Sequence, residues 1–281
     1  MTLAAQPGEP RGRGYHRAMD EEPGASTKTD DDARYEREQA FHDERFADDQ
    51  RPANRFYEVA GAAERHFCSL VDALPPSSRV LDFGCGADAR TAIRLARVGH
   101  RVAAIDLSSV AIECARARAA EAGVGERIEF RTMNAETLLF EDGFFDAVVG
   151  AGVLHHLDLR RSFAELVRVL APDGRAVFSE PMGHNPVINL YRRRTPEQRT
   201  PDEHPFVTAD IELAREYFDD VRLTAFVLTS LALVPFGAAR RSKRLVDALN
   251  RLDSRLMRAV PALKGFAWLA VFEFEGPRRI E

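Results

Sequence analysis

An acidic residue followed by a glycine-containing turn is the first feature of this sequence that could carry chemistry. Asp82 stands two positions before a turn made of Gly84, Cys85 and Gly86. Glycines allow a backbone to approach a ligand without a Cβ clash, and a helix that follows would direct its positively polarised N-terminus at the same spot. Asp106, about 20 positions further on, could accept hydrogen bonds from two ribose hydroxyls. The spacing therefore predicts a site for a ligand that contains an adenosine.

Two cofactors would satisfy that spacing. The residues from Gly84 to Ala89 fit the loose GxGxxA form of the dinucleotide fingerprint, so an NAD-dependent oxidoreductase is an alternative. The carboxylate of Asp82, however, would repel a pyrophosphate and attract the ammonium end of a methionine group. Asn134, after the third β-rich run, offers an amide that can pair with an adenine edge. These two residues favour S-adenosylmethionine.

Five motifs resemble those of the class I S-adenosylmethionine-dependent methyltransferases of the bacterial small-molecule type. They are VLDFGCG (80–86), AIDLS (104–108), MNAE (133–136), FFDAVVGAGVLHHL (144–157) and ELVRVLAPDGRAVFSEP (165–181). The resemblance covers about residues 79–182, in the family's order and spacing. It departs at Asp88, which replaces the third glycine of the family's turn, and at Asn134, which replaces an acid.

The resemblance implies a role for each matched position. Asp82 and the backbone of residues 84–86, Cys85 included, would hold the methionine group. Asp106 would bind the ribose beside Leu107, and Asn134 and Ala135 would bind the adenine edge. Gly150 and Ala151 would line the cofactor near its sulfonium. In addition, Tyr57 could place its ring near the sulfonium as a cation–π contact, with ordinary helix packing as the alternative.

Methyl transfer from a sulfonium needs mainly positioning, but a hydroxyl acceptor also needs a base. His155 and His156 follow the fourth β-rich run, where the acceptor should lie, and histidine titrates near neutral pH. Glu180 ends the fifth run at the same edge. These three are the candidate catalytic residues, although each could instead be a structural residue of its loop. No metal site is expected at His155, His156 and Asp158, because adjacent histidines on an extended chain point apart and no third ligand is evident.

The elements that must position these residues alternate regularly. Short β-rich runs occur at 79–83, 101–106, 128–134, 145–150 and 174–180, with helical patterns at 90–98, 109–122 and 159–170. This rhythm is typical of parallel β-α-β units. We expect an α/β, Rossmann-like, seven-stranded and mostly parallel sheet with helices on both faces. The resemblance implies that its last strand, at 267–274, is antiparallel and inserted beside a strand at 221–229.

Three segments are expected along the chain. Residues 1–33, rich in Gly, Pro and charge, are predicted to be a disordered tail. Residues 34–76 are predicted to form an N-terminal helical cap, and residues 77–281 the methyltransferase domain. Insertions at about 181–209 and 231–264 should contribute to the acceptor side. The basic run at 192–194 could meet an anionic acceptor, or could form a solvated face.

Composition restricts the partners. The net charge of −5 gives no sign of a nucleic-acid surface, and the three widely spaced cysteines suit a reducing compartment. The first residues lack the apolar run of a signal peptide, and no apolar stretch is long enough to span a membrane, so a cytoplasmic location is expected. Residues 231–264 include a basic amphipathic helix, predicted to be a packed cap; a membrane-surface element or a homodimer contact is the alternative.

Together these patterns predict S-adenosylmethionine-dependent methyl transfer to a small-molecule acceptor. The histidine pair favours an O-methyltransferase of a biosynthetic pathway. A C- or N-methyltransferase of a small or lipid-like metabolite is the alternative. A protein of another class, which binds the cofactor without catalysis, is a further alternative.

Overall fold

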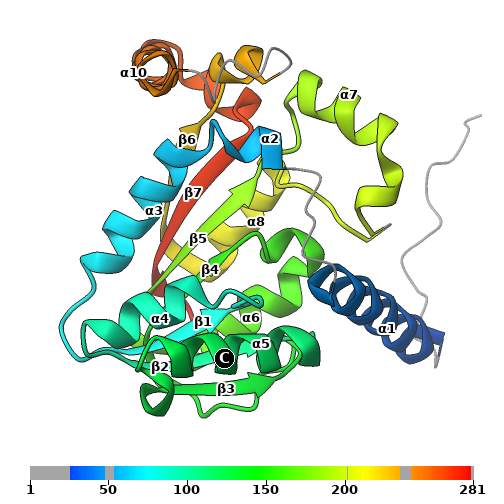
Figure 1. Cartoon of the computed structure of the whole chain (residues 1–281), viewed down its shortest axis with the longest axis vertical. Helices are drawn as coiled ribbons and strands as arrows, with labels where there is room; N and C mark the ends of the chain where they lie inside the picture. Colours follow the sequence, from blue (N-terminus) through cyan, green and yellow to red (C-terminus); the bar gives the residue numbers. More distant parts are fainter. Residues whose placement is uncertain (1–25, 48–53, 201, 235–241, 280–281) are drawn as a thin grey trace, which may run out of the picture.

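The fold is built on one seven-stranded sheet. The computed structural model describes residues 26–47, 54–200, 202–234 and 242–279. The strand order is β3-β2-β1-β4-β5-β7-β6, in which β7 is antiparallel to both of its neighbours and the other pairings are parallel (Figure 1). The strands are β1 (Arg79–Phe83), β2 (Arg101–Asp106), β3 (Ile128–Thr132), β4 (Phe145–Ala151), β5 (Leu170–Pro181), β6 (Phe218–Phe226) and β7 (Leu269–Pro277). The expected fold class is confirmed.

Helices join the strands and cover both faces of the sheet. They are α3 (Gly61–Asp72), α4 (Arg90–Arg97), α5 (Ser109–Glu121), α6 (Leu159–Val169) and α8 (Thr208–Tyr217). N-cap side chains fix the first residues of α5 and α6. The Ser108 hydroxyl accepts from the backbone N–H of Ala111 at the start of α5, and Asp158 accepts from Arg161 at the start of α6.

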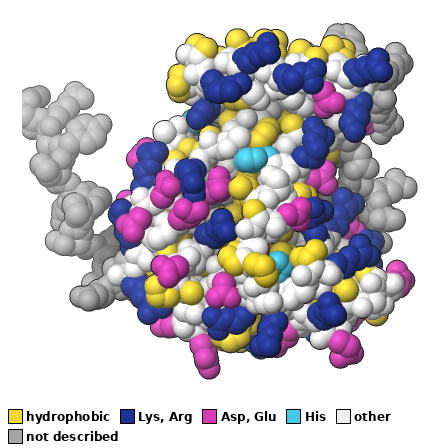
Figure 2. All heavy atoms as spheres, turned by 90° about the vertical axis from the view of Figure 1, so that its left-hand side faces the viewer, with side chains coloured by type: hydrophobic (Ala, Val, Ile, Leu, Met, Phe, Trp, Pro, Cys, Tyr) yellow, Lys and Arg dark blue, Asp and Glu magenta, His cyan; other side chains and the backbone are white. Residues whose placement is uncertain are grey.

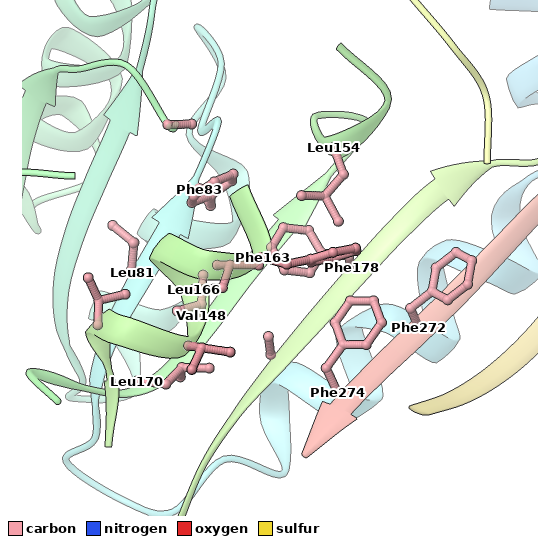
Figure 3. Packing of buried hydrophobic residues seen from close by; sticks show 14 of the residues in the cluster. Leu81, Phe83, Val148, Leu154, Phe163, Leu166, Leu170, Phe178, Phe272 and Phe274 are labelled. Carbon is pink, nitrogen blue, oxygen red and sulfur yellow. The ribbon is translucent and has the colours of Figure 1, made fainter. Parts of the chain in front are cut away.

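Alternate strand residues enter two separate apolar cores. Leu81 and Phe83 of β1 face α6 and α8, where Phe163 is fully buried. Val80 faces the opposite side, against α3, α4 and α5. Figure 3 shows Phe163 of α6 close to Phe178 of β5, with Phe272 and Phe274 of β7 continuing the aromatic layer. Because successive side chains of a strand point to opposite faces of the sheet, this alternation determines the face on which the side chain at each strand end lies.

The β4–β5 pairing contains an irregularity near its start. β5 begins at Leu170, earlier than the expected residue 174, and Leu170 pairs with Phe145. The register then shifts, so that Ala147 pairs with Arg175. The Pro-Asp-Gly segment at 172–174 is therefore an interruption within β5.

The N-terminal segment differs from the expected boundaries. Helix α1 (Ser26–Ala47) begins within residues 1–33, the predicted disordered tail, and residues 1–25 lie outside the described residues. The rest of the expected cap, within residues 34–76, contains α2 (Asn54–Tyr57) and α3. Figure 1 shows α1 as a separate rod beside the sheet rather than packed beneath it.

Both insertions contain regular structure. The first forms α7 (Pro186–Arg194) and the short helix η3 (Pro196–Gln198). The second forms η4 (Ser230–Leu233), α10 (Lys243–Ala259) and η5 (Pro261–Phe266), and residues 235–241 lie outside the described residues. The remaining short helices are η1 (Gly125–Arg127) and η2 (Leu154–His156).

Helix α10 carries the expected basic face and also an anchored one. Figure 2 shows Lys and Arg side chains gathered near the top of the molecule, where α10 lies. On its inner side, Asp253 is 1% exposed and accepts hydrogen bonds from the backbone N–H groups of Leu228 and Thr229. Within the described ranges, no helix is both long and apolar enough to cross a membrane.

Candidate cofactor and acceptor site

The glycine turn joins β1 to α4 and is fastened to β2. The backbone N–H groups of Gly84 and Cys85 both donate to the carbonyl of Ile105, at 3.0 and 2.9 Å. Gly84 has φ +77°, and a Cβ built on it would lie 2.6 Å from Cγ2 of Val153. Glycine is therefore required here by both the backbone conformation and the close approach of the β4–α6 loop. The turn is therefore held between β2, through Ile105, and the β4–α6 loop, through Val153.

Asp106 ties the two expected cofactor turns together. Its Oδ2 accepts from the N–H of Gly86 and its Oδ1 from the N–H of Ser108, both at 2.9 Å. Burial raises the pKa of Asp106, while the two backbone hydrogen bonds lower it. The carboxylate lies at the carboxyl end of β2, beside the glycine turn, where the sequence analysis placed a ribose.

Asp82 has a structural contact that the sequence did not reveal. It is 3% exposed, and its Oδ2 accepts from the N–H of Ala92 in α4 at 2.9 Å. Burial raises the pKa of Asp82 to about 7; the Ala92 hydrogen bond opposes this and the charge of Asp106 adds to it. Burial also raises the pKa of the neighbouring Cys85 thiol. Asp82 thus holds α4 against β1, which fixes the position of the turn.

The loop after β3 connects the expected adenine residues to helix α1. Asn134 Oδ1 accepts from the N–H of Glu136, and Ala135 beside it is buried. Glu136 Oε1 and Oε2 accept from the two terminal nitrogens of Arg34 at 2.8 and 2.7 Å, and the Tyr35 hydroxyl donates to Oε2. Sequence reasoning missed Glu136 as the anchor of the cap, because its partners are about 100 positions away in the chain.

Helix α1 also contacts the loop after β2. Gln39 Nε2 donates to the backbone oxygen of Leu107 at 3.2 Å, and Asp43 pairs with the hydroxyl of Ser108. Since Leu107 and Glu136 flank the expected adenosine site, α1 crosses the carboxyl ends of β2 and β3. The helix is positioned as a cap over that edge of the sheet.

Three further candidates lie apart from the polar groups. Gly150 is packed tightly, because a Cβ on it would be 2.6 Å from the ring of Phe178 and 2.8 Å from the oxygen of Phe83. Ala151 is exposed at the end of β4. Tyr57 is 57% exposed, and its ring centroid is 5.5 Å from that of Trp268. Tyr57 therefore contacts Trp268, and its cation–π role toward the sulfonium stays a prediction.

His155 and Glu180 form a buried pair at the ends of β4 and β5. His155 Nδ1 lies 2.7 Å from Glu180 Oε2, and Glu180 Oε1 accepts from the backbone N–H groups of Val153 and Leu154 at 3.0 Å each. Glu180 is 0% exposed. An ionised carboxylate only accepts hydrogen bonds, so the proton of the neutral imidazole is on Nδ1 and the lone pair is on Nε2. Burial lowers the pKa of His155, assisted by the charge of His156 and opposed by Glu180, which keeps the ring neutral at pH 7.

His156 faces the cap helix instead. Its Nδ1 lies 3.3 Å from Oε2 of Glu38, which in turn lies 3.5 Å from Nε2 of His42. Burial disfavours the charged ring, but the nearby Glu38 carboxylate outweighs this and raises the pKa of His156. The two adjacent histidines therefore differ: His155 is kept neutral, whereas His156 is stabilised as a cation.

The premise for excluding a metal was wrong. The rings of His155 and His156 do not point apart, since their centroids are 4.2 Å from each other. The donor atoms of Glu38, His42 and His156 lie within 4.8 Å of one another, as do those of His155, His156 and Glu203. These carboxylates come from α1 and from the segment after η3, which no local pattern around His155 could indicate.

The sheet order and the fastened glycine turn define a methyltransferase fold, and comparisons with known proteins agree. Residues 81–178 match the family described as a methyltransferase domain. The chain is 37% identical over 116 residues to demethylmenaquinone methyltransferase of Clavibacter sepedonicus, covering 41% of this chain and 45% of that protein. It is 33% identical over 141 residues to sarcosine/dimethylglycine N-methyltransferase of Halorhodospira halochloris, covering 49% and 48%.

A solved structure of geranyl diphosphate methyltransferase in complex with GPP and sinefungin shares the fold. Its TM-score is 0.53 at 19% identity, covering 75% of this chain and 78% of that one. Residues 81–178 therefore carry a methyltransferase domain, and the fold is that of the S-adenosylmethionine-dependent methyltransferases. The chain matches about half the length of these curated relatives, and the family match at residues 81–178 runs from β1 into β5.

Proposed function

We propose that this protein transfers the methyl group of S-adenosylmethionine to a hydroxyl group of a small-molecule acceptor in a biosynthetic pathway. The observation that carries the proposal is the His155–Glu180 pair, with Nδ1 and Oε2 2.7 Å apart. Glu180 fixes the ring and its tautomer, so that Nε2 can take the hydroxyl proton while the oxygen attacks the sulfonium methyl. A buried, neutral imidazole is in the correct form to accept that proton at pH 7.

The cofactor would lie across the carboxyl ends of β1 and β2. The turn at residues 84–86 would hold the methionine group, Asp106 the ribose, and the loop of Asn134 and Ala135 the adenine, under the cap formed by α1. The sulfonium methyl would then lie near the end of β4, next to the loop that carries His155. In-line transfer needs the acceptor on the far side of that methyl, which is the side of α7 and Glu203.

The similar proteins include 27-O-demethylrifamycin SV methyltransferase, sarcosine/dimethylglycine N-methyltransferase and geranyl diphosphate 2-C-methyltransferase, which differ in the atom that is methylated. Similarity therefore does not choose the accepting atom. The proposed base supports oxygen over nitrogen, because a hydroxyl group must lose its proton as it is methylated, whereas an amine can react as its free base.

A labelled-methyl assay with three matched acceptor groups tests the proposal. The groups are hydroxylated aromatics such as catechol, amines such as sarcosine, and carbon nucleophiles such as geranyl diphosphate. We expect label in the hydroxyl group alone, and a loss of about 10²-fold or more in kcat for His155→Gln. His184→Gln, at an exposed histidine in the same region, is the matched control.

Calorimetry separates the remaining alternatives. Binding of S-adenosylhomocysteine without binding of NAD supports the methyl donor and rejects the oxidoreductase. Binding without transfer to any acceptor group indicates the non-catalytic alternative. Label that enters amines or carbon, with His155→Gln as active as the natural chain, rejects O-methylation.

A further inference from the structure

Two arginines of the first insertion turn towards the interior. Arg192 lies in the last turn of α7 and is half-buried, whereas its neighbours Arg193 and Arg194 are exposed. Arg199 follows η3, and its Nε and Nη1 atoms are inaccessible to solvent and have no hydrogen-bond partner among the described residues. A buried guanidinium without acceptors is costly, because burial removes the water that would otherwise bind it.

The electrostatics of the pair point to a missing negative charge. Burial lowers the pKa of Arg192 to about 10, and the positive charge of Arg199 lowers it as well, while Glu203 raises it. A second guanidinium charge and the Glu203 carboxylate thus both act on Arg192, while two nitrogens of Arg199 have no acceptor among the described residues. Arg192 Nη1 donates to the Met182 carbonyl at 3.3 Å and to Asn189 Oδ1 at 3.2 Å. Both acceptors are uncharged, so these hydrogen bonds do not neutralise the guanidinium.

The pair lies beside the proposed base. Met182, which accepts from Arg192, is two positions beyond Glu180. Glu203, which acts on Arg192, has its Oε1 4.0 Å from Nε2 of His155. The backbone N–H of His204 donates to the His155 carbonyl at 2.8 Å. The segment that carries Arg199 therefore packs on the loop of His155, on the side where the acceptor is expected.

We infer that Arg192 and Arg199 bind an oxyanion, a carboxylate or a phosphate, that belongs to the methyl acceptor. The inference rests on the proposed function for its placement of the acceptor. A guanidinium presents parallel N–H donors that match a carboxylate or phosphate, and such charge-assisted contacts are strong when water is excluded. One anionic group would supply the acceptors that Arg199 lacks and neutralise the surplus charge. The acceptor is then anchored at one end by its anion, with its hydroxyl directed at His155.

Direct binding of small anions tests the inference without turnover. The whole chain, saturated with S-adenosylhomocysteine, is titrated calorimetrically with benzoate, phenyl phosphate and neutral benzamide. We expect benzoate or phenyl phosphate to bind and benzamide not to bind; the tighter of the two distinguishes a carboxylate from a phosphate acceptor. Arg199→Gln should weaken anion binding by roughly tenfold or more, the loss expected for a charged hydrogen bond. Arg193→Gln, at the exposed neighbouring arginine, should leave it unchanged.

Two controls keep the result decisive. First, each variant must bind S-adenosylhomocysteine with the affinity of the natural chain. Second, if Arg199→Gln fails to fold, Arg199→Lys replaces it, because lysine keeps the charge and lacks the parallel N–H donors. Equal binding of benzamide and benzoate, or equal losses in the Arg193 and Arg199 variants, would overturn the inference. If anions bind in a manner that depends on Arg199 but no hydroxyl group is methylated, the proposed function is rejected and the inference stands. If hydroxyl groups are methylated only in neutral acceptors, the inference is rejected and the proposed function stands.

Discussion

Glu180 holds the His155 imidazole by Nδ1, with its Oε2 at 2.7 Å, while its other oxygen is held by two backbone N–H groups. The two backbone hydrogen bonds hold the Glu180 carboxylate in place, and the carboxylate in turn orients the His155 ring. This relationship joins the ends of β4 and β5, which are adjacent in the sheet although the two residues are 25 positions apart. It is the arrangement from which the first prediction follows.

Glu180→Gln should preserve the loop and impair the chemistry. The amide oxygen can still accept from the backbone, but its NH₂ group then faces Nδ1, which forces the ring proton onto Nε2. In Ser–His–Asp enzymes the same tautomer error lowers kcat by about 10⁴. We expect a fall of about 10²- to 10⁴-fold in kcat with unchanged affinity for S-adenosylhomocysteine. Kinetics and calorimetry check this; an unchanged kcat would show that the pair is only structural.

Gly84→Ala should destabilise the protein by more than its backbone conformation explains. The added Cβ would meet Val153 at 2.6 Å, whereas a Cβ on Gly99, which also has positive φ, meets nothing within 4 Å. We expect Gly84→Ala to lower the free energy of unfolding by about 1–3 kcal/mol more than Gly99→Ala. Urea denaturation measures both. Adding Val153→Ala should recover part of the difference; no recovery would mean that Val153 is not the obstacle.

The raised pKa of Asp82, about 7, predicts an inverted pH dependence. In the unfolded chain an aspartate loses its proton near pH 3.9, so between about pH 4 and pH 7 the folded protein binds the extra proton. The free energy of unfolding should therefore fall as pH rises through this range, by up to about 1.4 kcal/mol per pH unit from this group, and level off above it. Asp82→Asn should lack this component. Urea denaturation from about pH 5 to about pH 8 compares the slopes, and parallel curves would contradict the assignment.

The Arg34–Glu136 pair should control how firmly the cap closes on the cofactor. Glu136 is buried and accepts from both terminal nitrogens of Arg34, so Arg34→Gln leaves a buried carboxylate poorly paired. We expect weaker binding of S-adenosylhomocysteine, by roughly tenfold, and faster tryptic cleavage within α1. Arg37→Gln on the same helix, which breaks an exposed pair with Asp202, is the control and should change little. Equal effects in both variants would argue against Glu136 as the anchor.

Helix α10 should stay docked rather than bind membranes. Its buried Asp253 accepts from two backbone N–H groups and from the Thr229 hydroxyl, and Val246 and Met257 are buried with it. We expect no flotation with anionic phosphatidylserine vesicles at physiological salt. Flotation that disappears in an Arg251→Gln, Arg255→Gln double variant would show instead that the basic face binds lipid.

The sequence alone determined the cofactor half of the protein. The bounds of β1 and β2 agree with the expected runs, because short buried strands bounded by glycine turns and followed by amphipathic helices leave few alternatives. The family resemblance of the same motifs implied the sheet class and the antiparallel last strand, and the structure confirms both. Arg192 was noticed as part of a basic run, but nothing local distinguished it from its exposed neighbours.

Only the tertiary structure decided which distant side chains meet. Glu136 receives Arg34 from α1, and His155 meets Glu203, because the cap helix and the first insertion fold back on the strand ends. The inward turn of Arg199 and the different environments of His155 and His156 depend on burial, which is a property of the packed chain. Local patterns specify strands, turns and helices within a few residues. Contacts between segments far apart in sequence depend on how those elements pack, and the acceptor side of this protein is built almost entirely from such contacts.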